Sequence, residues 1–132
     1  MNGRKFISGG ILALFATCAA GTALAQAWPA KPITVIVPFA AGGPVDIDTR
    51  KYGKRLTDLL GQPVLVDYKV GAGTAIGSGF VARARPDGYT LLTNSSAFST
   101  FPALYKDLNF DPLRDLAPVT QMSSLLSPLL VP

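Results

Sequence analysis

Histidine and glutamate are absent from this chain of 132 residues, and cysteine occurs once, at Cys18. Without histidine, His-dependent catalytic triads and imidazole zinc sites are excluded, and without glutamate, glutamate-based acid and base pairs are excluded. Aspartate, tyrosine, lysine and serine remain for any chemistry. We therefore expect no enzyme activity, no catalytic residues, no metal site and no cofactor.

A strong charge of either sign is also missing. The net charge is +4, and without Arg4 and Lys5 ten basic residues face eight aspartates, a balance of about +2. The one local basic cluster lies within a predicted helix, on its solvated face, and consists of Arg50, Lys51, Lys54 and Arg55. This balance is too mild to favour nucleic acid, and we expect no nucleic-acid partner.

Residues 1–25 have the pattern of a secretory signal peptide. A short basic region at Arg4 and Lys5 precedes a mostly apolar stretch over 7–20, and 23–25 reads Ala-Leu-Ala, an A-x-A cleavage signal. The apolar stretch is shorter than the ~20 residues that a bilayer requires. Cleavage after residue 25 removes Cys18, so residues 26–132 are expected to contain no disulfide and no thiolate.

Short apolar strands alternate with helices in residues 26–132, a pattern typical of an α/β fold with a parallel sheet and flanking helices. The predicted order is strand 33–37, helix from about 46 to 60, strand 64–66, a small-residue helix through 79–84, and strand 89–93. The first helix is amphipathic, and by its 3.6-residue period we expect its apolar side to cover the sheet. That side comprises Ile47, Tyr52, Leu56, Leu59 and Leu60.

The turn between the first strand and the first helix is the strongest candidate for a binding site. A helix N-terminus has unpaired backbone N–H groups and the positive end of the helix dipole, which together favour an anion. Gly42 and Gly43 allow close approach, and Pro44 suits the first helical turn. We expect the carboxylate of Asp46 to bond a backbone N–H there. The motif alone fits an ordinary turn without a ligand equally well.

A hydroxyl-rich loop follows the third strand at its carboxyl end, where ligands of open α/β sheets bind. Ser95 and Ser96 have no histidine and no evident lysine partner, so we expect them to donate hydrogen bonds and not to act as nucleophiles. A polar loop without function is the alternative.

Glycines at 71, 73 and 77 offer a different interpretation, a secreted nucleotide-dependent enzyme domain. They resemble a dinucleotide fingerprint only loosely, because the third glycine falls one place late and the preceding strand is the second. Asp46 and Asp48 form no convincing metal pair, because residues two apart at a helix start point in different directions.

Several motifs, in order, make the chain similar to the Bug family, the periplasmic solute receptors of tripartite tricarboxylate transporters. They are Trp28-Pro29-x-Lys31-Pro32-Ile33, Val37-Pro38-Phe39-x-Ala41-Gly42-Gly43-x-x-Asp46, Gly61-Gln62-Pro63-Val64, Gly71-Ala72-Gly73, Ala82-Arg83-Ala84, Asp87-Gly88-Tyr89-Thr90-Leu91-Leu92 and Pro102-x-Leu104-Tyr105. The resemblance implies part of a type II periplasmic-binding-protein lobe. It also implies a periplasmic receptor that delivers a small organic acid, a di- or tricarboxylate or similar, to a membrane permease of the transporter.

The resemblance also implies which residues hold the ligand, through backbone N–H groups, hydroxyls and bridging water. These are Phe39, Ala41, Gly42, Gly43 and Asp46 in the first turn and Thr93, Ser95 and Ser96 in the later loop. The chain departs from the family pattern where Pro44-Val45 replaces the frequent Gly-Thr, which removes one N–H and one hydroxyl donor.

Family members are considerably longer, and this chain matches only their N-terminal part. Apolar runs at 116–122 and 125–131 precede Pro132, and no helix follows to cover a last strand. We therefore expect a truncated protein, residues 26–132 being the N-terminal part of the first lobe with the second lobe absent, which alone binds weakly or not at all. A non-functional remnant is a further alternative.

Overall fold

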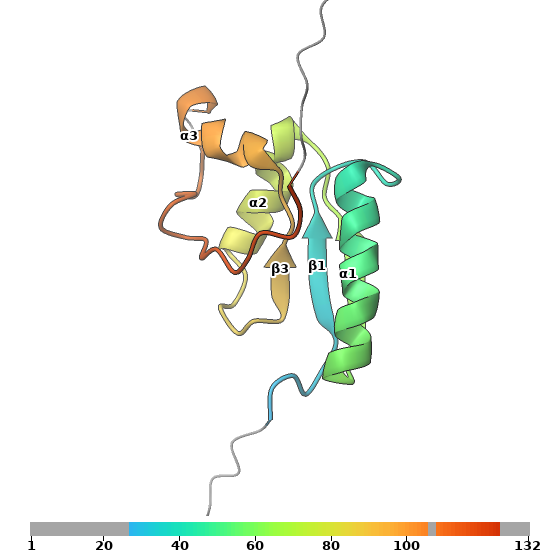
Figure 1. The fold of residues 1–132 in the computed structure, drawn as a ribbon. Coiled ribbons are helices and arrows are strands. Elements are labelled where there is room, and N and C mark those ends of the chain that lie inside the picture. Colours follow the sequence, from blue (N-terminus) through green and yellow to red (C-terminus); the bar gives the residue numbers. More distant parts are fainter. Residues whose placement is uncertain (1–26, 106–107, 125–132) are drawn as a thin grey trace, which may run out of the picture.

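The computed structural model describes residues 27–105 and 108–124, so the predicted signal peptide and the apolar run 125–131 lie outside it. Three strands alternate with helices and short helical turns (Figure 1). The elements are β1 (Ile33–Val37), α1 (Pro44–Leu60), β2 (Val64–Tyr68), η1 (Ala72–Thr74), α2 (Ala75–Ala82), β3 (Thr90–Leu92), η2 (Ser96–Thr100) and α3 (Phe101–Leu104).

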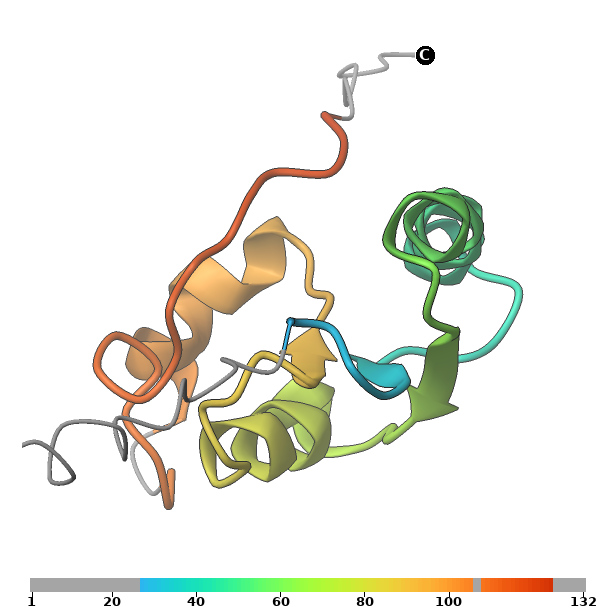
Figure 2. The same cartoon turned by 90° about the horizontal axis from the view of Figure 1, so that it is seen from below.

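The three strands form one parallel sheet in the order β2-β1-β3, which confirms the predicted fold class. Seen from below in Figure 2, α1 and α2 lie on opposite faces of this sheet. Residues of the central strand β1 are therefore covered on both sides, and Ile36 and Val37 are fully buried. Crossover helices on both faces are what a nearly continuous apolar strand requires.

The strand boundaries differ from the prediction at two places. β2 continues two residues past Val66, because Tyr68 pairs with Val37 and the next residue, Lys69, donates its N–H to the Val37 carbonyl at 3.1 Å. β3 is shorter than predicted and comprises Thr90–Leu92 alone. These ends depend on strand register, which the local pattern does not encode.

α1 begins and ends where the sequence places its signals. Pro44 occupies the first helical turn, and Gly61 ends the helix in the left-handed region with φ 68° and donates its N–H to the Thr57 carbonyl at 3.0 Å. Glycine suits this position because other residues pay a steric penalty there.

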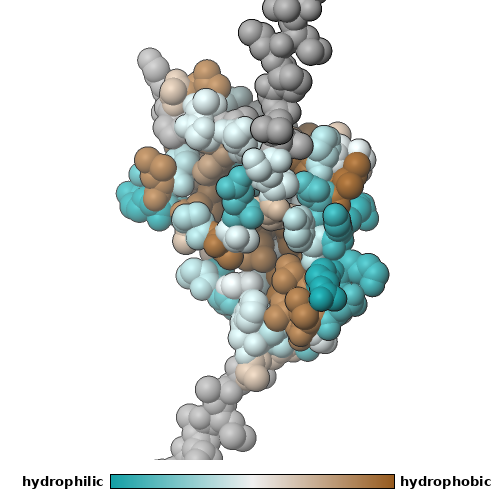
Figure 3. Space-filling view, viewed as in Figure 1, coloured by the Kyte–Doolittle hydropathy of each residue, from teal (hydrophilic) through white to brown (hydrophobic). Residues whose placement is uncertain are grey.

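The face that α1 turns to the sheet is not the predicted apolar side. Asp46, Thr49 and Gly53 are the buried residues of the helix, whereas Leu59 remains 66% exposed and Ile47 58% exposed. Figure 3 shows apolar side chains at the surface on the side where α1 lies at the right. The prediction was wrong because small and polar residues let the helix approach closely.

Two contacts explain this close approach. A Cβ at Gly53 would lie 3.4 Å from Val64 Cγ1, so the helix backbone nearly touches β2. The Thr57 hydroxyl accepts the N–H of Val64 at 3.0 Å and donates to the Gly53 carbonyl at 3.0 Å. The stripe Asp46, Thr49, Gly53 and Thr57 has helical spacing, so one polar face packs on the sheet.

α2 packs on the other face by its small residues, as expected. A Cβ at Gly77 would lie 2.8 Å from Pro38 Cβ and 2.9 Å from the Lys69 carbonyl oxygen, and Ser78 is fully buried. Beyond β3, the rings of Phe101 and Tyr105 pack at a tilt with their centroids 4.8 Å apart, and Phe101 is buried in a second small core.

Residues 108–124 contain no helix or strand. The apolar run 116–122 reaches α1 at its end, where the Met122 carbonyl accepts a hydrogen bond from the Tyr52 hydroxyl at 2.7 Å. Within the described ranges, no helix combines the length and the apolar character needed to cross a bilayer.

Candidate functional site

The predicted site lies at the carboxyl edge of the sheet. Because β1 is central, the turn after it lies between the segments that follow β2 and β3. In open parallel sheets this edge, outside the strand ends, is where ligands bind. The topology therefore brings the first predicted group, 39–46, and the second, 93–96, to the same side of the molecule.

The turn 39–43 leaves several backbone donors without partners. Gly42, with φ +83°, donates its N–H to Asp46 Oδ2 at 2.8 Å. In the described part of the chain, the N–H groups of Ala41, Gly43 and Val45 donate no hydrogen bond. Ala41 is exposed and Gly43 is partly exposed, so these donors are available to an anion at the start of a 17-residue helix.

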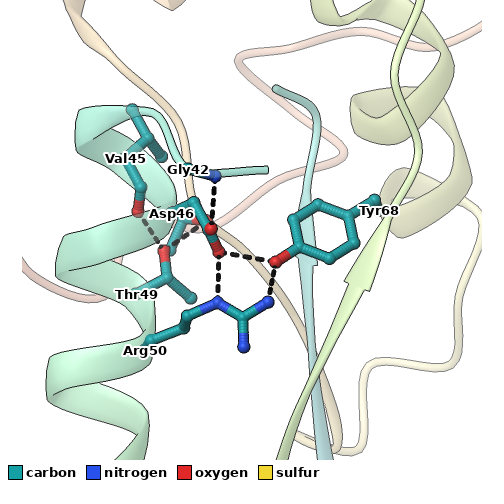
Figure 4. Close-up of polar contacts among 7 residues, drawn as sticks. Gly42, Val45, Asp46, Thr49, Arg50 and Tyr68 are labelled. Carbon is teal, nitrogen blue, oxygen red and sulfur yellow. Dashed lines mark hydrogen bonds and ion pairs between the residues drawn. The ribbon is translucent and has the colours of Figure 1, made fainter. Parts of the chain in front are cut away.

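Asp46 closes this turn from the inside, as the sequence analysis expected of its carboxylate (Figure 4). Its side chain is only 4% exposed, and its Oδ1 accepts bonds from Arg50 Nε at 2.9 Å and from the Tyr68 hydroxyl at 2.7 Å. Arg50 Nη2 also donates to the Tyr68 hydroxyl. With Gly42 on Oδ2, both carboxylate oxygens are occupied by the protein, so Asp46 holds the turn and has no oxygen directed at a ligand.

The same contacts stabilise the charged form of Asp46. The Gly42 N–H and then the Tyr68 hydroxyl hold the pKa of the Asp46 carboxyl below its usual range, and Arg50 adds to this against the opposing effect of burial. The hydrogen bond to Asp46 raises the pKa of Tyr68, whose hydroxyl stays protonated. The side chains of Arg50 and Asp46 are therefore an ion pair at neutral pH.

Thr93 lies at the edge of the predicted site, with its hydroxyl turned inward. The residue is 7% exposed, its N–H donates to the Ile36 carbonyl at 3.0 Å, and its Oγ1 lies 3.1 Å from Thr49 Oγ1. Thr49 in turn donates to the Val45 carbonyl at 2.6 Å. Thr93 thus connects the end of β3 to the first turns of α1 and offers a ligand little surface.

The other predicted residues are more open. Phe39 and Ser95 are partly exposed, and Ser96 is exposed. Ser95 donates its N–H to Asn94 Oδ1 at 2.9 Å, but within residues 27–105 and 108–124 neither serine forms a hydrogen bond with the turn 39–46. The structure therefore places both serines at this edge without joining them to the glycine turn.

Thr49, Arg50 and Tyr68 are not among the residues that the sequence predicts for the site. Arg50 lies on a solvated face, as predicted, with its side chain 58% exposed, but its position four residues after Asp46 is also the spacing of a helical ion pair. Tyr68 had no usable signal, because its role depends on pairing with Val37 across the sheet.

The glycines of the loop 71–77 are explained by backbone conformation and contacts within the chain. Gly71 and Gly73 have positive φ angles of 138° and 58°, which favour glycine, and a Cβ at Gly77 would lie 2.8 Å from Pro38 Cβ. Backbone conformation and packing thus supply a reason for each glycine that needs no pyrophosphate, and they disfavour the nucleotide interpretation.

A metal site has no support among the described residues, which contain no group of three or more possible ligands. The carboxylates of Asp46 and Asp48 point to separate partners, since Asp48 accepts a hydrogen bond from the Ser123 hydroxyl at 2.8 Å.

Together, the parallel sheet, the helices on both faces and the glycine turn after the central strand define part of an α/β lobe. The sequence profile described as tripartite tricarboxylate transporter family receptor matches residues 49–132, and the chain belongs to this family.

Curated relatives match three quarters or more of the chain. A UPF0065 protein from Pseudomonas sp. (strain P51) is 36% identical over 130 residues, which is 98% of this chain and 39% of the relative. Protein BugT of Bordetella pertussis is 40% identical over 103 residues, or 76% of this chain and 32% of BugT. The chain thus spans between 32% and 39% of the length of these relatives.

Solved structures give the same picture. The periplasmic binding protein BugD is 44% identical with a TM-score of 0.63, covering 67% of this chain and 29% of BugD. MatC of Rhodopseudomonas palustris with bound malate is 36% identical with a TM-score of 0.60, covering 71% and 32%. Rpa4515 of R. palustris with adipate is 31% identical with a TM-score of 0.61, covering 65% and 29%.

Proposed function

We propose that residues 26–132 are the N-terminal part of the first lobe of a periplasmic solute receptor, and that residues 1–25 are its signal peptide. The receptor captures a small organic acid, a di- or tricarboxylate, and delivers it to the membrane permease of a tripartite tricarboxylate transporter. The family membership and the neighbours that hold malate and adipate support the ligand class.

The observation that carries the proposal is the set of unpaired N–H groups at Ala41, Gly43 and Val45. Amide donors fixed at a helix start hold a carboxylate by charge-assisted hydrogen bonds, each of which contributes about 1.5–3 kcal/mol. Ser95 and Ser96 are the hydroxyl donors from the neighbouring loop, and Phe39 lines the turn. The function is binding without chemistry, and a second lobe closes over the ligand.

An NMR titration tests this proposal. The ¹⁵N-labelled chain is titrated with malate, adipate and the neutral diamide of malate, and amide shifts are followed residue by residue. Because one lobe supplies only part of the contacts, we expect a Kd of about 1 mM or weaker. The two acids should shift the amides of Ala41, Gly43 and Val45, and the diamide should not.

Shifts confined to other parts of the chain, or equal shifts with the diamide, would contradict the proposal. A titration with NADP in place of the acids tests the alternative, a nucleotide-dependent enzyme domain. That function requires amide shifts at residues 71–77.

A further inference from the structure

Tyr68 lies where β2 meets the turn that follows β1. The sheet register pairs it with Val37, the last residue of β1, and its hydroxyl reaches Asp46 Oδ1 at 2.7 Å. Among the described residues that donate to the Asp46 carboxylate, Tyr68 comes from a strand, whereas Arg50 belongs to α1 and Gly42 to the turn before it.

Asp46 presents an electrostatic problem for a carboxylate bound at this turn. A negative charge near the helix start repels an anionic ligand unless a positive charge neutralises it. Arg50 Nε donates to Asp46 Oδ1 at 2.9 Å and its Nη2 donates to the Tyr68 hydroxyl, whose single proton points to Asp46. The hydroxyl thus accepts from the cation and donates to the carboxylate.

We propose that Tyr68 is a positioning residue for the ligand-binding turn, because its hydroxyl holds Asp46 Oδ1 beside Arg50 and leaves Oδ2 to fix the N–H of Gly42. This arrangement turns the negative charge inward and leaves the N–H groups of Ala41 and Gly43 to the ligand. The inference rests on the proposed function, and in it Tyr68 acts through Asp46 and Gly42.

The test compares Tyr68→Phe with Tyr52→Phe in the ¹⁵N-labelled chain. Both variants lose one phenolic hydroxyl, but that of Tyr52 donates to the Met122 carbonyl at 2.7 Å and not to Asp46. Two quantities are measured. The first is the pH midpoint of the change in the Gly42 amide shift, which reports the titration of the Asp46 carboxylate that this amide binds. The second is the Kd for malate. Arg50 and Tyr68 are the titratable groups that face Asp46 in the described structure.

Tyr68→Phe should move the Gly42 midpoint upward, toward the ordinary carboxyl value, and weaken malate binding by roughly three- to tenfold. Tyr52→Phe should move neither. An unchanged midpoint in Tyr68→Phe overturns the inference, as does an equal change in Tyr52→Phe.

If neither malate nor adipate shifts the amides of the turn 39–46 in the parent chain, the ligand site proposed there fails, and the Gly42 midpoint still decides whether Tyr68 positions the turn. If Tyr68→Phe does not fold, Arg50→Lys replaces it. This variant keeps the charge but loses the two-pronged contact, and it must shift the midpoint and the Kd in the same directions.

Discussion

The side-chain oxygens of Thr49 and Thr93 lie 3.1 Å apart, and both residues are less than 10% exposed. Thr49 belongs to α1 and Thr93 follows β3, so a polar contact joins the helix to the strand end on the other side of β1. This contact fixes the first turns of α1, where the open N–H groups lie.

Thr93→Val should therefore destabilise the chain. The substitution removes the hydroxyl that lies near Thr49 and the Ile36 carbonyl while keeping the branched shape, and we expect a loss of about 1 kcal/mol. Thr34→Val is the control, because the Thr34 hydroxyl forms no hydrogen bond within the described residues. Urea unfolding measures the free energy of unfolding of both variants. An equal loss in the two would contradict a stabilising contact of the Thr93 hydroxyl.

Gly53→Ala should leave the fold intact and stabilise it. The added Cβ would meet Val64 Cγ1 at 3.4 Å, an ordinary contact, while alanine gains up to about 1 kcal/mol over glycine in a helix. Gly53→Leu should instead force α1 from β2 and cost about 1–3 kcal/mol. If Gly53→Ala destabilised the chain, α1 would have to lie closer to β2 than the 3.4 Å contact with Val64 indicates. Thermal and urea unfolding measure both variants.

Gly77→Ala should destabilise the chain, in contrast to Gly53→Ala, although both glycines lie within helices. Its Cβ would lie 2.9 Å from the backbone oxygen of Lys69 and 2.8 Å from Pro38 Cβ, and neither neighbour yields easily. We expect a net loss of about 1–3 kcal/mol despite the helix gain. If urea unfolding gave a free energy equal to that of the parent, the close packing of α2 on the sheet would be wrong.

The contribution of Asp46 to stability should depend on pH. Its pKa is lower in the folded chain than in the unfolded chain, so the stabilisation is complete above the ordinary carboxyl pKa and is lost as the pH falls through the folded value. The unfolding free energy of the parent should therefore exceed that of Asp46→Asn near pH 7, and the difference should shrink in acid. A difference independent of pH between 2 and 7 would contradict the ion pair.

The sequence predicts the parts of this fold that local signals determine. The apolar run of β1, Pro44 at the start of α1 and Gly61 after its end all lie where expected, and the alternation of elements gives the parallel sheet. Such features need no knowledge of distant residues.

The parts that the sequence does not predict depend on contacts between elements. The buried face of α1 follows from how closely Gly53 approaches β2, and hydrophobic periodicity places the opposite side inward. In the candidate site, the inward bond of Asp46 is predictable from its position in the first turn. Tyr68 is not, because only the register with Val37 brings its hydroxyl there.

The most direct measurement compares malate binding by Gly43→Pro and Gly43→Ala. Gly43 has φ −76°, which proline adopts, its N–H forms no hydrogen bond in the described residues, and an added Cβ lies 3.5 Å from the Ala40 oxygen. Proline therefore removes the donor, whereas alanine keeps it. We expect Gly43→Pro to weaken malate binding at least about tenfold, while Gly43→Ala stays within about threefold of the parent. Equal affinities of Gly43→Pro and the parent chain would contradict this expectation.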